Sequence, residues 1–106
     1  MKKLIVIFLL ISTNSFSQSI NGLVIDGDYN EPMAFANVII KGTTKGTTTD
    51  IDGKFSIDVD PGVYTLQFSF IGYDTKEITD INVILGNEDN YIEVTLIPSS
   101  NELETV

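Results

Sequence analysis

The sequence predicts an all-β fold, an antiparallel β-sandwich of about seven strands, preceded by a signal peptide. Two observations favour the sandwich. Apolar and polar residues alternate with a period of two in several runs, whereas no window shows apolar residues at helical spacing. Turn residues separate these runs at short intervals, which is typical of two packed sheets. A third observation, an apolar stretch at the N-terminus, is typical of export.

The N-terminal segment has the three parts of a secretory signal peptide. Two lysines precede the apolar stretch Leu4 to Ile11, and a small polar stretch follows it, with serines at the third and the first position before Gln18. The apolar stretch is far shorter than the ~20 residues that a membrane-spanning helix needs. No cysteine follows it, so a lipoprotein anchor is excluded. We therefore predict that residues 1–17 are removed and that the chain is exported.

The positions of the strands follow from the alternating runs. In chain order, we expect strands at residues 19–26, 36–41, 46–50, 54–59, 63–70 and 91–96, with a weaker edge strand at 74–79 that residues 81–85 either extend or follow. The residues that share the predicted inner face are Ala36, Val38, Ile40, Phe55, Ile57, Val59, Tyr64, Leu66, Phe68, Phe70, Ile92, Val94 and Leu96. Inner residues of two facing sheets would form one core.

Four short segments are predicted turns, at residues 26–32, 41–46, 50–53 and 60–62. Pro61 and Gly62 fit the centre of a type II turn, in which Gly62 takes a positive φ. The stretch TTDIDGKF, residues 48–55, raises the question of whether its two aspartates bind metal. We interpret it as a β-hairpin connection, with the aspartates bonding to their own backbone and Gly53 in the left-handed conformation.

Composition excludes several classes of function. The chain contains no histidine and no cysteine, its six basic residues are all lysines, and its net charge is −9. Phosphate backbones and anionic lipid surfaces would repel such a chain, so we predict no nucleic-acid binding. Without histidine or cysteine, no Ser-His, Cys-His, zinc or thiolate site can form. We predict that the chain is not an enzyme and holds no cofactor.

The two acidic loops are incomplete as metal sites. A calcium loop of the EF-hand type needs a glycine at its sixth position and a bidentate glutamate at its twelfth. In the loop that begins at Asp26, these positions hold Glu31 and Asn37. In the loop that begins at Asp50, core residues follow the two aspartates. We predict that both loops are turns rather than metal sites.

A series of short motifs occurs along the chain in a specific order and spacing. The pieces are Gly22 with Val24 and Asp26, Glu31-Pro32, Ala36-Asn37-Val38, Lys41-Gly42-Thr43, Gly46-Thr47, Thr49-Asp50 with Gly53 and Phe55, Gly62 with Tyr64, and Phe70 with Gly72-Tyr73. In this, the chain resembles the carboxypeptidase-regulatory-like domain found at the N-terminus of TonB-dependent outer-membrane receptors of the starch-utilisation type. The resemblance implies a sandwich of the prealbumin or immunoglobulin-like type at residues 18–97, without peptidase activity.

The resemblance also implies a function and partners. It implies a non-catalytic accessory domain of a nutrient-import receptor, at the periplasmic face of the outer membrane. Residues 98–106 would be a polar linker and the start of a TonB box, formed by Leu103, Glu104, Thr105 and Val106. The partners would be the C-terminal domain of TonB and the plug and barrel of the receptor, with membrane association only through the barrel.

The alternative is a stand-alone secreted β-sandwich that serves as an interaction or carbohydrate-binding module. Aromatic residues predicted to face inward argue against a sugar-binding platform. Only Tyr29 and Tyr91, far apart in the sequence, are candidates for exposed rings.

Overall fold

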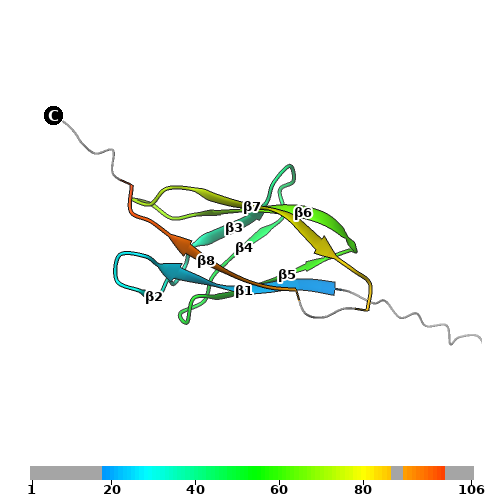
Figure 1. Cartoon of the computed structure of the whole chain (residues 1–106), viewed down its shortest axis with the longest axis horizontal. Helices are drawn as coiled ribbons and strands as arrows, with labels where there is room; N and C mark the ends of the chain where they lie inside the picture. Colours follow the sequence, from blue (N-terminus) through cyan, green and yellow to red (C-terminus); the bar gives the residue numbers. More distant parts are fainter. Residues whose placement is uncertain (1–17, 87–89, 100–106) are drawn as a thin grey trace, which may run out of the picture.

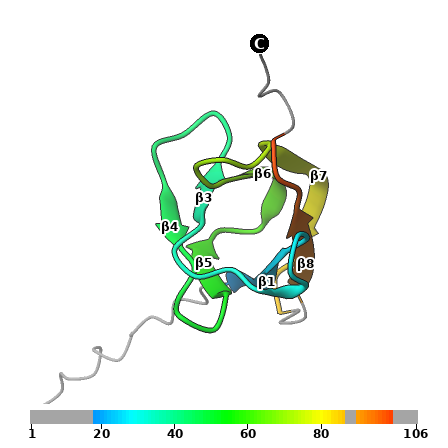
Figure 2. The same ribbon diagram turned by 90° about the vertical axis from the view of Figure 1, so that its left-hand side faces the viewer.

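The computed structural model of the chain describes residues 18–86 and 90–99, which form two β-sheets packed face to face (Figures 1 and 2). Within these residues no helix is long and apolar enough to cross a membrane. The predicted signal peptide, residues 1–17, and the tail segment Leu103 to Val106 lie outside the described residues. Both therefore remain predictions.

The first sheet is built around β1 (Gln18–Asp26). β5 (Lys54–Val59) and the two-residue β2 (Glu31–Pro32) pair antiparallel with it. β8 (Tyr91–Leu96) pairs parallel with it. Residues in the middle of β1 pair with β5 and β8 at once, so these two strands lie on opposite sides of β1.

The second sheet has the order β4-β3-β6-β7 and is antiparallel throughout. Its strands are β4 (Gly46–Thr48), β3 (Asn37–Ile40), β6 (Gly62–Ser69) and β7 (Lys76–Val83). β7 corresponds to the weak edge strand predicted at residues 74–79. It continues to Val83, so the residues from 81 onward extend this strand and do not begin another. The all-β sandwich is confirmed. It differs in two details, the additional β2 and the parallel pairing of β8.

One apolar core fills the space between the sheets. It consists of Ile20, Val24, Met33, Ala36, Val38, Ile40, Phe55, Ile57, Val59, Leu66, Phe68, Val83, Val94 and Leu96. At its centre the rings of Phe55 and Phe68 meet edge to face, with centroids 5.5 Å apart. The predicted burial of these two residues, of Leu66 and of Val94 is confirmed. Tyr64, Phe70 and Ile92, also predicted to face inward, are half-buried and pack against the core.

Two details predicted for the turns are wrong. Gly62 does not have a positive φ, because it is already the first residue of β6 and pairs with Val83. The hydroxyl of Tyr64 holds this turn instead, donating a hydrogen bond of 2.6 Å to the carbonyl oxygen of Asp60. The connection at residues 48–55 is not a β-hairpin, because β4 and β5 belong to different sheets. It carries the chain from one sheet to the other.

Candidate binding surface at the C-terminal exit

The two acidic loops are turns, as predicted. The Oδ1 of Asp26 accepts a hydrogen bond of 2.8 Å from the backbone N–H of Asp28. The Oδ1 of Asp50 accepts two, from Asp52 at 2.9 Å and from Lys54 at 3.0 Å. These bonds use a carboxylate oxygen in each loop to close the local backbone. Across residues 18–86 and 90–99, no three residues with metal-ligating side chains come together.

Gly53 shows why the second loop has its sequence. Its φ is +78°, a conformation that glycine adopts without steric cost. A Cβ at this position would lie 2.9 Å from the Cβ of Pro32 and 2.9 Å from the carbonyl oxygen of Val24. The loop therefore packs closely on the first sheet, and its backbone continues the bonding of β1 through a Val24 N–H to Gly53 O bond of 2.8 Å.

Thr49 fixes the neighbouring loop between β2 and β3. Its buried hydroxyl donates a bond of 2.6 Å to the carbonyl oxygen of Met33 and accepts one of 2.8 Å from the N–H of Ala36. Its backbone carbonyl accepts a further bond from Phe35, which is exposed and has a φ of +65°. The sequence predicted Thr49 only as the end of a strand. The pattern of the sequence contains no signal for this set of contacts.

The described chain ends in a segment that is bonded to the β6–β7 connection. After β8, the carbonyl oxygen of Ile97 accepts a bond of 2.9 Å from the N–H of Asp74. The N–H of Ser99 donates one of 2.8 Å to the carbonyl oxygen of Gly72. Between them, Pro98 forms an antiparallel bridge with Tyr73. Residues 97–99, here called the exit segment, therefore run as a short strand beside the β6–β7 connection.

Tyr73 joins this exit segment to the first sheet. Its hydroxyl donates a hydrogen bond of 2.8 Å to Oδ2 of Asp26, at the end of β1. This bond is the main reason why the pKa of Tyr73 rises from 10.0 to about 12, with burial and the nearby acidic charges adding to it. The ring also meets Phe70 edge to face, with centroids 5.8 Å apart. The sequence placed Asp26 at the start of a turn and Tyr73 between two strands, and it gave no indication that they meet.

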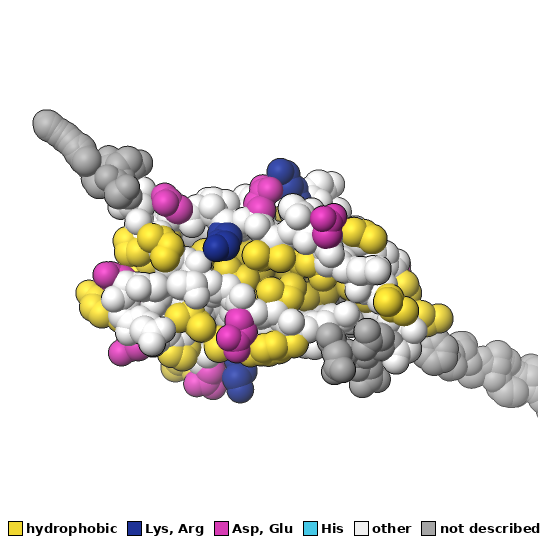
Figure 3. Space-filling model, in the orientation of Figure 1, with side chains coloured by type: hydrophobic (Ala, Val, Ile, Leu, Met, Phe, Trp, Pro, Cys, Tyr) yellow, Lys and Arg dark blue, Asp and Glu magenta, His cyan; other side chains and the backbone are white. Residues whose placement is uncertain are grey.

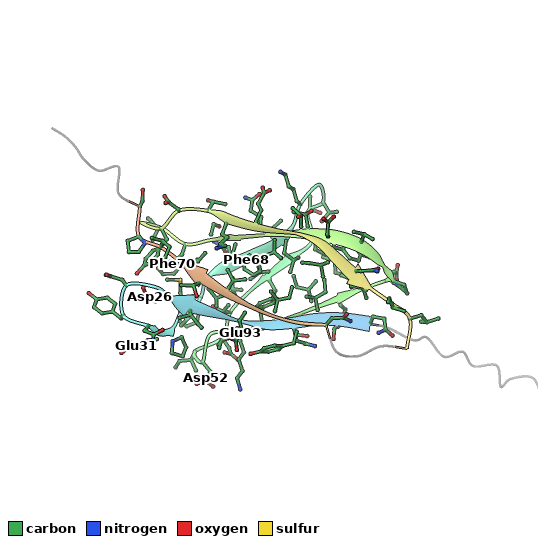
Figure 4. The ribbon with its side chains drawn as sticks, viewed as in Figure 1. Asp26, Glu31, Asp52, Phe68, Phe70 and Glu93 are labelled. Carbon is green, nitrogen blue, oxygen red and sulfur yellow. The ribbon has the colours of Figure 1, made fainter. Side chains whose placement is uncertain are left out.

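Exposed apolar and acidic side chains gather around the exit segment. We call this surface the exit patch and define it by its apolar members and then its acidic members: Tyr29, Ile71 and Ile97, with Asp28, Glu31 and Asp74. Figure 3 shows yellow apolar and magenta acidic side chains at the left-hand end, and Figure 4 places Asp26, Glu31 and Phe70 at the same end.

The outer face of the first sheet carries a second candidate surface. It is a groove of about 480 Å³, lined among others by Asn21, Lys54, Ser56 and Tyr91. The pairing of β1 with both neighbours aligns Ser56, Asn21 and Tyr91 in one row across the sheet. The hydroxyl of Tyr91 donates a bond of 3.1 Å to Oε2 of Glu93, and partial desolvation followed by this bond raises the pKa of Tyr91.

Tyr29 and Tyr91 are both exposed, as expected, but they do not form one platform. Tyr91 pairs with Asn21, whereas the loop that carries Tyr29 follows Asp26 at the far end of β1. Five residues of strand at 3.3 Å each place roughly 17 Å between Asn21 and Asp26. A single sugar ring cannot stack on both side chains, so the groove would have to bind with Tyr91 alone.

Comparison with known proteins gives sequence relatives over most of the chain. The sequence profile of the CarboxypepD_reg-like domain matches residues 20–106. TonB-dependent receptor P3 of Formosa agariphila is 30% identical over 105 residues, which cover 92% of this chain and 10% of the receptor. TonB-dependent receptor SusC of Bacteroides thetaiotaomicron is 36% identical over 94 residues, which cover 84% of this chain and 9% of the receptor. The chain thus spans about a tenth of the length of these curated relatives.

Solved structures with the same fold come from a type II cohesin–X–dockerin complex of Acetivibrio cellulolyticus. A chain of its N-terminal interface mutant aligns with a TM-score of 0.64 and 26% identity, covering 76% of this chain and 58% of that chain. A chain of the C-terminal interface mutant aligns with a TM-score of 0.62 and 27% identity, covering 74% and 56%. Both similarities support the β-sandwich assignment.

Proposed function

We propose a function that proceeds from one premise: this chain belongs to the CarboxypepD_reg-like domain family, and its sequence relatives are TonB-dependent receptors. We infer that it is a non-catalytic accessory domain of such a receptor, exported and placed at the periplasmic face of the outer membrane. The observation that supports this most directly is the match to P3 and SusC over most of the chain. TonB-dependent receptors are transporters rather than enzymes.

The tail is proposed to be the primary contact with TonB. Leu103, Glu104, Thr105 and Val106 would begin an extended segment that pairs along the edge of a sheet in the C-terminal domain of TonB. Such pairing gains affinity mainly from main-chain hydrogen bonds. It must also offset the ordering of the segment, which costs about 1–2 kcal/mol per residue. With only two apolar residues in this stretch, we expect the 106-residue chain to bind TonB weakly, and a longer chain that continues into valines to bind more tightly.

Titration against one purified TonB C-terminal domain tests the tail. Three proteins would be compared: the 106-residue chain, the same chain extended by its natural downstream residues, and the chain without residues 101–106. We expect the extended chain to bind most tightly and the shortened chain least. Equal affinity for all three would place the contact elsewhere. The DNA after codon 106 gives an independent test, because the proposal requires a reading frame for a plug and a barrel.

Export is proposed from the N-terminal sequence pattern. We expect the periplasmic protein to begin at Gln18, because the basic, apolar and small polar parts of residues 1–17 follow one another in the order that signal peptidase requires. N-terminal sequencing of periplasmic material would check this. Recovery of Met1 in that fraction would be inconsistent with cleavage.

The groove beside Tyr91 favours a second candidate function, a stand-alone module that binds a polar ligand such as a neutral sugar. Asn21, Ser56 and Lys54 offer polar groups there, and Tyr91 offers one exposed ring. A glycan titration followed by NMR would test it. Shifts confined to the groove that are lost in Tyr91→Ala would favour this function over the receptor role.

A further inference from the structure

We propose that the exit patch is a second contact surface for TonB, beside the tail that pairs with it. This inference rests on the proposed function, because it takes the same partner. The proposed site lies on the folded domain itself. The partner surface would carry an apolar centre surrounded by lysine or arginine side chains.

The exit segment brings the patch and any partner of the tail close together. Ser99 is bonded to Gly72 inside the patch, so the origin of the tail is fixed there. An extended chain covers at most about 3.6 Å per residue, so Leu103 lies no more than about 14 Å from Ser99. A folded domain of 100 residues has a radius of gyration of about 13 Å. A domain of this size that pairs with residues 103–106 is therefore held against this end of the molecule.

Three apolar side chains at this end have little cover from the described chain. The exposed fractions are 89% for Ile71, 70% for Tyr29 and 53% for Ile97. All three belong to segments at the exit end of the molecule. The Cδ1 of Ile97 lies 2.8 Å from where a Cβ on Gly27 would stand, so its side chain lies across the loop that carries Tyr29.

The other two apolar members belong to loops at the same end. Ile71 directly precedes Gly72, which accepts the bond from Ser99. Tyr29 is close enough to Tyr73 to contribute to its raised pKa. All three side chains therefore belong to the exit segment or to the loops that adjoin it, and exposed apolar side chains that gather in this way among polar residues mark contact sites.

The charge around this surface defines the partner. The three segments that build this end, residues 26–32, 70–75 and 96–99, contain four acidic residues and no basic residue, and the exposed Lys76 follows them at the start of β7. Asp28, Glu31 and Asp74 are exposed. A second copy of this chain is a poor occupant, because its net charge is also −9. A basic partner is favoured, and binding to this surface should weaken as salt rises.

The tail makes even a weak contact effective. Once residues 103–106 are paired with TonB, contact with the patch becomes an intramolecular step. Short linkers give effective concentrations in the millimolar range, so a patch that binds with a millimolar Kd still adds to the total affinity. The patch thus needs no deep pocket to contribute.

An NMR titration of the labelled 106-residue chain with purified TonB C-terminal domain tests the inference. We expect shifts at Tyr29, Ile71 and Ile97. The patch variant Ile71→Ser should raise Kd about three- to tenfold, because burial of even part of an isoleucine side chain contributes a factor of this order. The charge variant Asp74→Asn should flatten the salt dependence of Kd.

Two matched variants serve as controls on the remainder of the surface. Val63→Ser removes an exposed apolar side chain from the start of β6, and Asp58→Asn removes an exposed charge from β5. Both residues lie at the opposite end, where Asp58 pairs with Ser19 near the start of β1. Neither change should alter Kd. Urea melts of all four variants exclude unfolding as the cause of any loss.

The outcomes separate this inference from the proposed function. If deletion of residues 101–106 weakens binding but Ile71→Ser behaves like Val63→Ser, the tail keeps its role and the patch is refuted. If the deletion has no effect and Ile71→Ser weakens binding, the patch stands and the role of the tail is refuted. Absence of shifts at the patch up to millimolar TonB overturns the inference. Shifts that depend only on the concentration of the chain itself, which indicate self-association, overturn it as well.

Discussion

Replacing Phe68 with alanine tests the packing on which the whole sandwich depends. Phe68 is fully buried at 0% exposure, lies on β6, and meets Phe55 edge to face at 5.5 Å. Core Phe→Ala changes cost about 3–5 kcal/mol, through lost burial and the cavity left behind. A domain with roughly 80 folded residues has ~4–12 kcal/mol of unfolding free energy, at 0.05–0.15 kcal/mol per residue. The substitution should therefore remove a quarter of the stability or more.

Urea unfolding measures this loss. With a slope of about 1 kcal/mol per molar urea, the midpoint of Phe68→Ala should fall by roughly 3 M or more, or the variant should be unfolded without urea. Phe68→Leu changes less volume and should cost about 1–1.5 kcal/mol, which keeps the measurement in range. Phe35→Ala is the matched control, since Phe35 is 64% exposed. A midpoint for Phe68→Ala close to that of the wild type, or an equal fall for Phe35→Ala, would refute the assignment of the core.

Three further predictions concern a buried hydroxyl, a tyrosine and the acidic loops. Thr49→Val should destabilise the fold by about 2–4 kcal/mol, because two buried backbone groups lose their partner; urea melts against Thr49→Ser, which keeps the hydroxyl, check this. The hydrogen bond of Tyr73 favours the neutral phenol in the folded state, so its contribution is complete below pH 10 and is lost as the pH rises toward 12. Stability measured against pH should show this loss in the wild type and not in Tyr73→Phe, and identical curves would contradict it. Millimolar calcium should add much less than the roughly 2.7 kcal/mol expected of a site occupied at 100 times its Kd; thermal melts at constant ionic strength check this, and a large shift that disappears in Asp28→Asn or Asp52→Asn would contradict it.

Strands could be predicted from the sequence because their signal is local. In β5, every second residue is buried, and the alternation of KFSIDV already contains that information. Pairing is not local in this sense. The parallel pairing of β8 with β1 joins residues about seventy positions apart, such as Asn21 and Tyr91. An alternating run looks the same whether its neighbour is parallel or antiparallel, so the alternation left this open.

The exit patch could not be predicted for the same physical reason. Asp26 and Tyr73 are 47 positions apart, and each reads as an ordinary residue of a connection in its own segment. Ile71 and Ile97 look like apolar residues at the ends of strands, which are usually buried. Only the arrangement of three segments at one end leaves them exposed together. The hairpin predicted at residues 48–55 failed likewise, because turn chemistry does not specify which sheet receives the next strand.

The exit end of the sandwich is bonded to both sheets. At the exit end, residues 97–99 are bonded to the β6–β7 connection of the second sheet. Through Tyr73 and Asp26 that connection is bonded to the end of β1 in the first sheet. A displacement of the tail is therefore resisted by both sheets and is not confined to β8. Such an attachment suits a domain whose tail is held by a partner, because the patch and the tail then keep a fixed relation to each other when the partner moves.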